Sequence, residues 1–158
     1  MAPPYVFAMR KIVTYIVFIA AVLGLGILSG LSTLPGEWYQ SLEKPFFNPP
    51  AWLFAPVWTV LYILIGIAGA RIWLVAPASA AMQIWFVQIA LNMLWSPTFF
   101  GLQATGLALL LIVAILVSIL GFIWKAGPID RLAAMLFLPY AAWVGFATLL
   151  NASIFLMN

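Results

Sequence analysis

The chain has 158 residues, of which 67% are apolar and 6% are charged, with a formal net charge of +3. A soluble domain carries about 25% charged residues, so six Lys and Arg with three Asp and Glu cannot cover a water-facing surface. The composition therefore predicts an integral membrane protein. Cysteine and histidine are absent, which excludes a disulfide framework, most zinc sites, a Ser-His-Asp triad and a histidine-ligated haem. With so few charged residues, the net positive charge reflects how the chain is oriented in the membrane and does not predict a nucleic acid partner.

Apolar segments long enough to cross a bilayer recur along the chain. A spanning helix needs about 20 apolar residues. We predict an all-α membrane protein, a single domain of five transmembrane helices, with spans at about 12–31, 51–73, 80–100, 105–124 and 132–156. Residues 1–9 are expected to be irregular, and Met9 is an alternative start. The first apolar run is too long for a signal peptide and lacks a small-residue cleavage site, so we expect it to be retained.

The Lys and Arg residues fall unevenly between the two ends of this predicted bundle. Lys44 alone lies on the side of the first loop, whereas the other cations lie on the N-terminal side: Arg10, Lys11, Arg71, Lys125 and Arg131. Cytoplasmic loops carry an excess of Lys and Arg. We therefore expect a multi-pass protein of a bacterial membrane with its N-terminus in the cytoplasm.

The loop Trp38–Pro50, between the first two spans, is rich in proline and aromatic residues. Proline fixes φ and removes a backbone donor, so we expect this loop to be held in shape without helix or sheet hydrogen bonds and to act as a lid. Two roles remain open for Lys44: it binds an anionic group of a ligand, or it forms an ion pair with Glu43 or Glu37.

Polar and aromatic side chains recur at helical spacing in three of the spans. Each span thereby gains one mixed face: Trp58 and Tyr62; Gln88, Asn92 and Ser96, with Trp95 nearby; and Tyr140, Trp143, Ala147 and Asn151. Polar residues within spans tend to face the bundle interior. One reading is a pocket for a large, flat, mostly apolar ligand. The other is hydrogen bonding and packing between helices, worth about 0.6–2 kcal/mol per bond.

Proline and glycine positions within the spans leave further alternatives open. Pro97 and Pro139 each remove a helical hydrogen bond, which predicts either a packing kink or a cavity widened near the lid. Gly26-x-x-x-Gly30 is a small-residue pattern that suits an internal contact or a dimer seam. Trp52, Trp73 and Trp124 lie at span ends and fit an interfacial belt.

Four motifs together resemble the translocator protein family (TspO/MBR, tryptophan-rich sensory proteins). They occur in the family's order and cover about Trp38 to Asn151: Trp38-Tyr39-x-x-Leu42-x-Lys44-Pro45-x-x-Asn48-Pro49-Pro50; Pro56-Val57-Trp58-Thr59-x-Leu61-Tyr62; Gln88-x-Ala90-Leu91-Asn92-x-x-Trp95-x-Pro97-x-Phe99-Phe100-Gly101; and Pro139-Tyr140-x-x-Trp143-x-x-Phe146-Ala147-Thr148-x-x-Asn151. The resemblance implies a five-helix bundle, usually a homodimer, whose pocket is closed by the loop after the first helix.

The resemblance also implies ligands. Members bind protoporphyrin IX, haem, and isoquinoline carboxamide or benzodiazepine-type drugs, and some bind cholesterol. No resident cofactor is expected, with porphyrin as ligand. The cholesterol motif needs Tyr and then Lys or Arg after the fifth span, and the tail Asn151–Asn158 has neither, so cholesterol is expected to bind weakly at most.

By position, the resemblance assigns Trp58 and Trp143 as the pocket tryptophans tied to porphyrin chemistry. Asn92 becomes a polar ligand contact, and Ala147 becomes a small residue of the pocket wall. Phe46 stands where several bacterial relatives have Trp. The full predicted ligand-binding set is Phe46, Trp58, Tyr62, Gln88, Asn92, Trp95, Tyr140, Trp143, Ala147 and Asn151.

Three functions compete for this pocket. The first is a receptor or sensor that binds porphyrin and regulates tetrapyrrole or stress responses. The second is a light-dependent porphyrin-degrading enzyme in which Trp58 or Trp143 supplies an electron, since the spans hold no acid–base pair. The third is a porphyrin or sterol transporter, which is least favoured because intramembrane charges and broken-helix repeats are not evident in the sequence.

Overall fold

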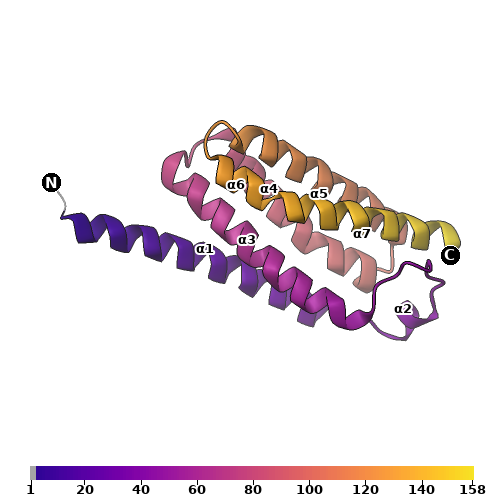
Figure 1. Ribbon diagram of the computed structural model, residues 1–158. Coiled ribbons are helices and arrows are strands. Elements are labelled where there is room, and N and C mark those ends of the chain that lie inside the picture. The colour runs from indigo at the N-terminus through magenta and orange to yellow at the C-terminus, as the bar shows by residue number, and fades with distance from the viewer. Residues whose placement is uncertain (1–2) are drawn as a thin grey trace.

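The structure is a computed structural model that describes residues 3–158, and all regular structure in that range is helical. The long helices lie side by side, and the N-terminal half of the first one extends beyond the bundle (Figure 1). In chain order the elements are α1 (Pro4–Ser32), α2 (Glu37–Ser41), the 3₁₀ turn η1 (Ala51–Leu53), α3 (Phe54–Val75), α4 (Ala80–Ser96), the π-helical turn η2 (Pro97–Gly101), α5 (Thr105–Ala126), α6 (Arg131–Leu136) and α7 (Leu138–Met157).

Four helical segments are long and apolar enough to cross a membrane: Pro4–Ser32, Ala51–Val75, Thr105–Ala126 and Arg131–Met157. This finding confirms the predicted all-α, multi-pass membrane protein. Helix α4 has 17 residues, fewer than any of these four segments, and continues directly into η2, which ends at Gly101.

Two local predictions were wrong. Helix α1 begins at Pro4 because proline is well suited to the first helical turn and no helix-breaking residue follows it before Lys11. The first two residues of the predicted irregular segment 1–9 lie outside the described residues. Helix α2 forms within the first loop because its prolines begin only at Pro45, so the earlier half is free to make helical hydrogen bonds. The last predicted span, 132–156, falls within the single apolar segment Arg131–Met157. That segment is interrupted at Phe137, between α6 and α7, because Pro139 in the first turn of α7 cannot donate a helical hydrogen bond.

Close helix packing depends on small residues. Helix α1 packs on α3, α4 on α5, α5 on α7, and α3 on α6. Where α1 meets α3, a Cβ built on Gly26 would lie 2.2 Å from the Tyr62 ring, whereas one built on Gly30 would meet nothing within 4 Å. The Gly26 end of the small-residue pattern is therefore an internal contact. The buried core around it includes Leu61, Ile65, Met82, Trp85, Phe122 and Tyr140.

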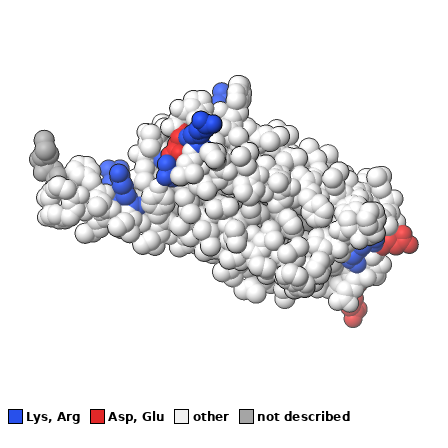
Figure 2. Space-filling model, in the orientation of Figure 1, with Lys and Arg blue, Asp and Glu red and all other residues white. Residues whose placement is uncertain are grey.

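The charged groups separate toward the two ends of the molecule, as Figure 2 shows. At the N-terminal end, Nε of Arg71 in α3 lies 2.9 Å from Oδ2 of Asp130. The Asp130 carboxylate also accepts from the Ala133 N–H and so caps α6. Burial acts to raise the pKa of the Asp130 carboxyl, but the Ala133 N–H and the Arg71 guanidinium outweigh it and hold that pKa below its usual value.

Candidate functional site

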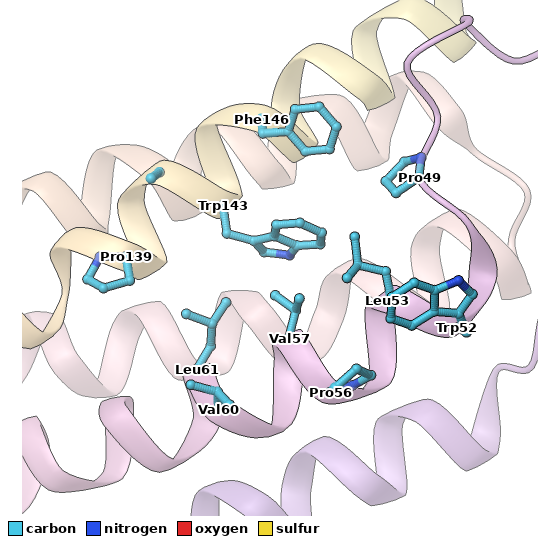
Figure 3. Close-up of a pocket in the computed structure, with 11 residues that line it drawn as sticks. Pro49, Trp52, Leu53, Pro56, Val57, Val60, Leu61, Pro139, Trp143 and Phe146 are labelled. Carbon is cyan, nitrogen blue, oxygen red and sulfur yellow. The ribbon is translucent and has the colours of Figure 1, made fainter.

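An open groove of about 860 Å³ lies between the N-terminal half of α3 and the first half of α7. Figure 3 shows the Trp143 ring extending from α7 across the space toward α3, with Phe146 and Pro49 at the loop end. The lining is almost entirely apolar and consists of Pro49, Trp52, Leu53, Pro56, Val57, Val60, Leu61, Pro139, Ala142, Trp143 and Phe146. This volume lies within the range of ligand pockets, about 300–1,000 Å³. We call it the α3–α7 groove.

The wall of this groove contains one unpaired donor. Nε1 of Trp143 is buried and has no hydrogen-bond partner among residues 3–158. Buried indole N–H groups usually find an acceptor, and an unmade hydrogen bond of this kind costs about 1–3 kcal/mol. The ring is held in place by Phe54, at 5.9 Å between centroids, and by Phe146, at 5.7 Å. Because this atom is buried, a ligand carrying an acceptor would bond to the N–H only after the side chains that cover it move.

Next to the groove, four of the predicted site residues form a hydrogen-bonded network in the bundle interior. The Tyr140 hydroxyl donates to Oε1 of Gln88 at 2.9 Å and accepts from Nδ2 of Asn92 at 2.6 Å. The Tyr62 hydroxyl lies 3.5 Å from Oδ1 of Asn92. Gln88, Asn92 and Tyr140 are buried, and Trp58 packs on Tyr62 with ring centroids 5.3 Å apart. Here the polar stripes join helices α3, α4 and α7 to one another, so the helix-joining reading holds for these residues.

A second polar contact lies nearer the loop end of the bundle. Nε1 of Trp95 donates to Oδ1 of Asn151 at 3.1 Å, and Nδ2 of Asn151 donates to the Thr105 carbonyl at 3.0 Å. The Trp95 ring stacks on Phe99 in η2 at 5.0 Å. These contacts join α4, α5 and α7, and neither Trp95 nor Asn151 lines the groove.

The Trp38–Pro50 loop covers this end of the bundle but does not present Phe46 to it. Phe46 is 101% exposed, whereas Phe47 packs against Phe146 at 6.1 Å. Nζ of Lys44 donates to the Leu42 carbonyl at 3.1 Å and lies 4.6 Å from the centroid of the Tyr39 ring. Among residues 3–158 the only ion pair joins Arg71 and Asp130, so the pairing of Lys44 with Glu37 or Glu43 is not formed.

Of the ten residues predicted for the site, Trp143 alone lines the groove. Ala147 lies one turn further along α7 and packs against the core. The groove residues that we missed are mostly aliphatic side chains and prolines, types that give no chemical signal in a membrane protein. Pro139 is the one proline singled out within a predicted span that lies in the groove lining. Pro97 lies outside the groove, at the start of η2.

Residues 3–157 match the TspO/MBR family model. The chain is 39% identical over 152 residues to the tryptophan-rich protein TspO of Archaeoglobus fulgidus, which covers 94% of this chain and 99% of the relative. It is 34% identical over 144 residues to the tryptophan-rich sensory protein of Cereibacter sphaeroides, covering 91% and 90%. It is also 35% identical over 161 residues to the human translocator protein, covering 96% and 89%. Each similarity extends over nearly the whole of both chains.

Proposed function

The chain belongs to the TspO/MBR family, and from this membership we propose that it is a membrane receptor whose α3–α7 groove binds porphyrins. Protoporphyrin IX and haem are the first ligands to test, and flat aromatic drugs of the isoquinoline carboxamide or benzodiazepine type are the second class. The observation that carries the proposal is the buried, unpaired Nε1 of Trp143 in the wall of an apolar groove of about 860 Å³. A porphyrin offers both a large apolar face and hydrogen-bond acceptors.

The shape and lining of the groove support a flat ligand. Trp143, Phe146 and Trp52 present rings along the groove, and aromatic faces stack favourably on a macrocycle. The lining holds no cation for the propionates, so we expect these groups to lie in water at the open loop end near Pro49. The chain has no histidine or cysteine to serve as an axial iron ligand, which favours metal-free porphyrin, or haem held by its rim.

The membrane arrangement is part of the same proposal. We infer that α4, extended by η2, forms a fifth transmembrane element, because α4 packs on the spanning helix α5 and also contacts α1. We also propose a homodimer in a bacterial membrane with the N-terminus in the cytoplasm, the orientation that the positive-inside rule favours for Arg10, Lys11 and Arg71.

A dark titration with protoporphyrin IX tests the proposed function. The porphyrin absorbance band is followed as the ligand is added to three purified proteins: the unchanged chain, Ala142→Phe and Ala20→Phe. Ala142→Phe fills the groove from an exposed position, and Ala20→Phe makes the same change at an exposed position of α1. Saturable binding that Ala142→Phe weakens at least tenfold and Ala20→Phe leaves unchanged is the expected result. Non-saturable uptake, equal in all three proteins, would mean partitioning into detergent and would overturn the proposal.

A second candidate function is light-dependent porphyrin breakdown. It is favoured by one observation: the indole of Trp143, a side chain that can be oxidised, lies in the groove wall where a porphyrin would stack. This candidate requires the binding proposed above and predicts in addition that illumination bleaches the bound porphyrin only when the indole is present.

A further inference from the structure

A second groove, of about 320 Å³, lies on another part of the bundle, between α1, α4 and the end of α3. Its lining is apolar throughout and includes Phe18, Val22 and Leu25 on α1, with Trp85 and Ile89 on α4. None of these residues belongs to the α3–α7 groove. We call it the α1–α4 groove.

The floor of the α1–α4 groove is rigid. The Phe18 ring lies 5.2 Å from the Trp85 ring and 5.9 Å from the Trp73 ring. The Trp85 indole is fixed by a hydrogen bond of 2.9 Å from its Nε1 to the Ile65 carbonyl. A Cβ built on Gly69 would lie 2.4 Å from this indole, so the ring rests directly on the α3 backbone. An apolar groove with such a floor suits a hydrocarbon chain.

Two cations continue the same faces of α1 toward the N-terminal end of the molecule. Lys11 precedes Phe18, Val22 and Leu25 by seven, eleven and fourteen residues, a spacing that keeps a helical face aligned. Arg10 likewise precedes Val17, another lining residue, by seven. At 1.5 Å per residue, each cation lies about 10 Å beyond the start of the groove. The apolar run 12–31 spans a bilayer core of about 30 Å, which puts these two cations at headgroup depth.

The positive charge above the groove is uncompensated within the described chain. Arg10 and Lys11 are exposed, and neither side chain has a hydrogen bond or ion pair among residues 3–158. At this end of the bundle Asp130 pairs with Arg71. The other two carboxylates of the chain, Glu37 and Glu43, lie in the loop at the opposite end. A partner that fits is therefore apolar where it lies in the groove and anionic where it reaches Arg10 and Lys11.

We propose that the α1–α4 groove binds an anionic phospholipid. One acyl chain lies against Phe18, Val22 and Leu25, and the phosphate lies between Arg10 and Lys11. Zwitterionic phospholipid has the same chains but carries its own cation beside the phosphate, so it gains less from these two residues. Each Lys or Arg near an anionic membrane surface contributes about 1 kcal/mol, which predicts a preference for the anionic lipid of about 10- to 30-fold.

Native mass spectrometry of the purified full chain tests this site with two probes of equal chain length, dioleoyl phosphatidylglycerol and dioleoyl phosphatidylcholine. The variant Arg10→Gln/Lys11→Gln removes both cations without touching the apolar lining. Lys125→Gln is the matched control, because Lys125 lies at the same end of the molecule but rests on the Trp124 ring of α5. Ala21→Phe narrows the groove itself.

The expected result is saturable retention of phosphatidylglycerol in preference to phosphatidylcholine. The preference falls about 10- to 30-fold in Arg10→Gln/Lys11→Gln and stays unchanged in Lys125→Gln, and Ala21→Phe weakens both lipids. Equal retention of the two lipids, or equal losses in both charge variants, would overturn the proposal. Lipid-free dimers whose formation Ala21→Phe abolishes would overturn it as well, since a second copy would then occupy the groove.

Discussion

The side chain of Asn158 forms two hydrogen bonds with the backbone of Glu43, 115 positions earlier in the chain. Oδ1 accepts from the Glu43 N–H at 2.9 Å, and Nδ2 donates to the Glu43 carbonyl at 3.0 Å. The amide thus pairs with the loop as a neighbouring strand would. It ties the Trp38–Pro50 loop to the end of α7, the helix that carries Trp143.

Asn158→Ala should loosen this loop. Losing two hydrogen bonds, each worth about 0.5–1.5 kcal/mol, should speed hydrogen–deuterium exchange of the Glu43 amide about tenfold. Ser153→Ala is the control, since that hydroxyl bonds only to the Leu149 carbonyl of its own helix. Exchange of the Trp38–Pro50 segment that is the same in both variants would show that the pairing does not hold the loop.

Trp143→Phe separates the two candidate functions. Phe keeps the ring but removes the N–H and the oxidisable indole, so the dark affinity for protoporphyrin IX should fall about 3- to 10-fold, the value of one hydrogen bond. If the protein degrades porphyrin, light-driven loss of porphyrin absorbance should stop. Trp52→Phe, at the exposed rim of the groove, is the control. Bleaching that continues in Trp143→Phe would exclude Trp143 as the electron donor.

Gly26→Ala should destabilise the bundle by about 1–3 kcal/mol, because the new methyl group would overlap the Tyr62 ring and overpacking costs energy of this order. Gly24→Ala is the matched control on the same helix, since its Cβ would meet nothing within 4 Å. That change should be neutral or stabilising by up to about 1 kcal/mol. Thermal unfolding in detergent compares the two, and equal melting temperatures would contradict the packing argument.

Tyr140→Phe tests whether the interior network stabilises the bundle or binds ligand. Removing this hydroxyl leaves the Gln88 amide without the bond to its Oε1, and its Nε2 already lacks a partner. The folded state should lose about 1–3 kcal/mol. Tyr62→Phe, which loses only a contact of 3.5 Å, should lose less than about 0.5 kcal/mol. Porphyrin affinity should stay unchanged in both variants. A tenfold loss of affinity in Tyr140→Phe alone would show that porphyrin binds at the interior network and not in the α3–α7 groove.

Acid should weaken the contact between α3 and α6. The pKa of Asp130 is lower in the folded protein than its unfolded value of about 3.9, so its contribution is present above about pH 4 and is lost as the pH falls through the folded pKa. Asp130→Asn keeps a helix-capping oxygen but removes the charge. We expect it to cost about 1–2 kcal/mol at pH 7 and to flatten the fall in melting temperature below pH 4. If the melting temperature of Asp130→Asn fell below pH 4 as steeply as that of the unchanged protein, groups other than Asp130 would be responsible for the fall.

The sequence predicted the polar faces of the helices but, apart from Trp143, not the residues that line the groove. The spacing of Gln88 and Asn92 placed both amides on one face of a helix, and the structure keeps them together. The spacing could not say that Tyr140 would lie between them, because helical periodicity orients a side chain about its own axis and carries no information about the neighbouring helix. The structure shows the interhelical hydrogen bonds that one of the two alternatives for Gln88 and Asn92 predicted.

The sequence by itself determined that this is a helical membrane protein with its cations gathered at one end. Nine charges in 158 residues leave no other way to solvate the surface, and each helix satisfies its own backbone in lipid. The tertiary structure alone decided that the groove opens between α3 and α7, that Trp143 keeps an unpaired N–H within it, and that Asn158 reaches Glu43. These features depend on how helices far apart in the chain pack against one another, and local spacing does not encode that arrangement.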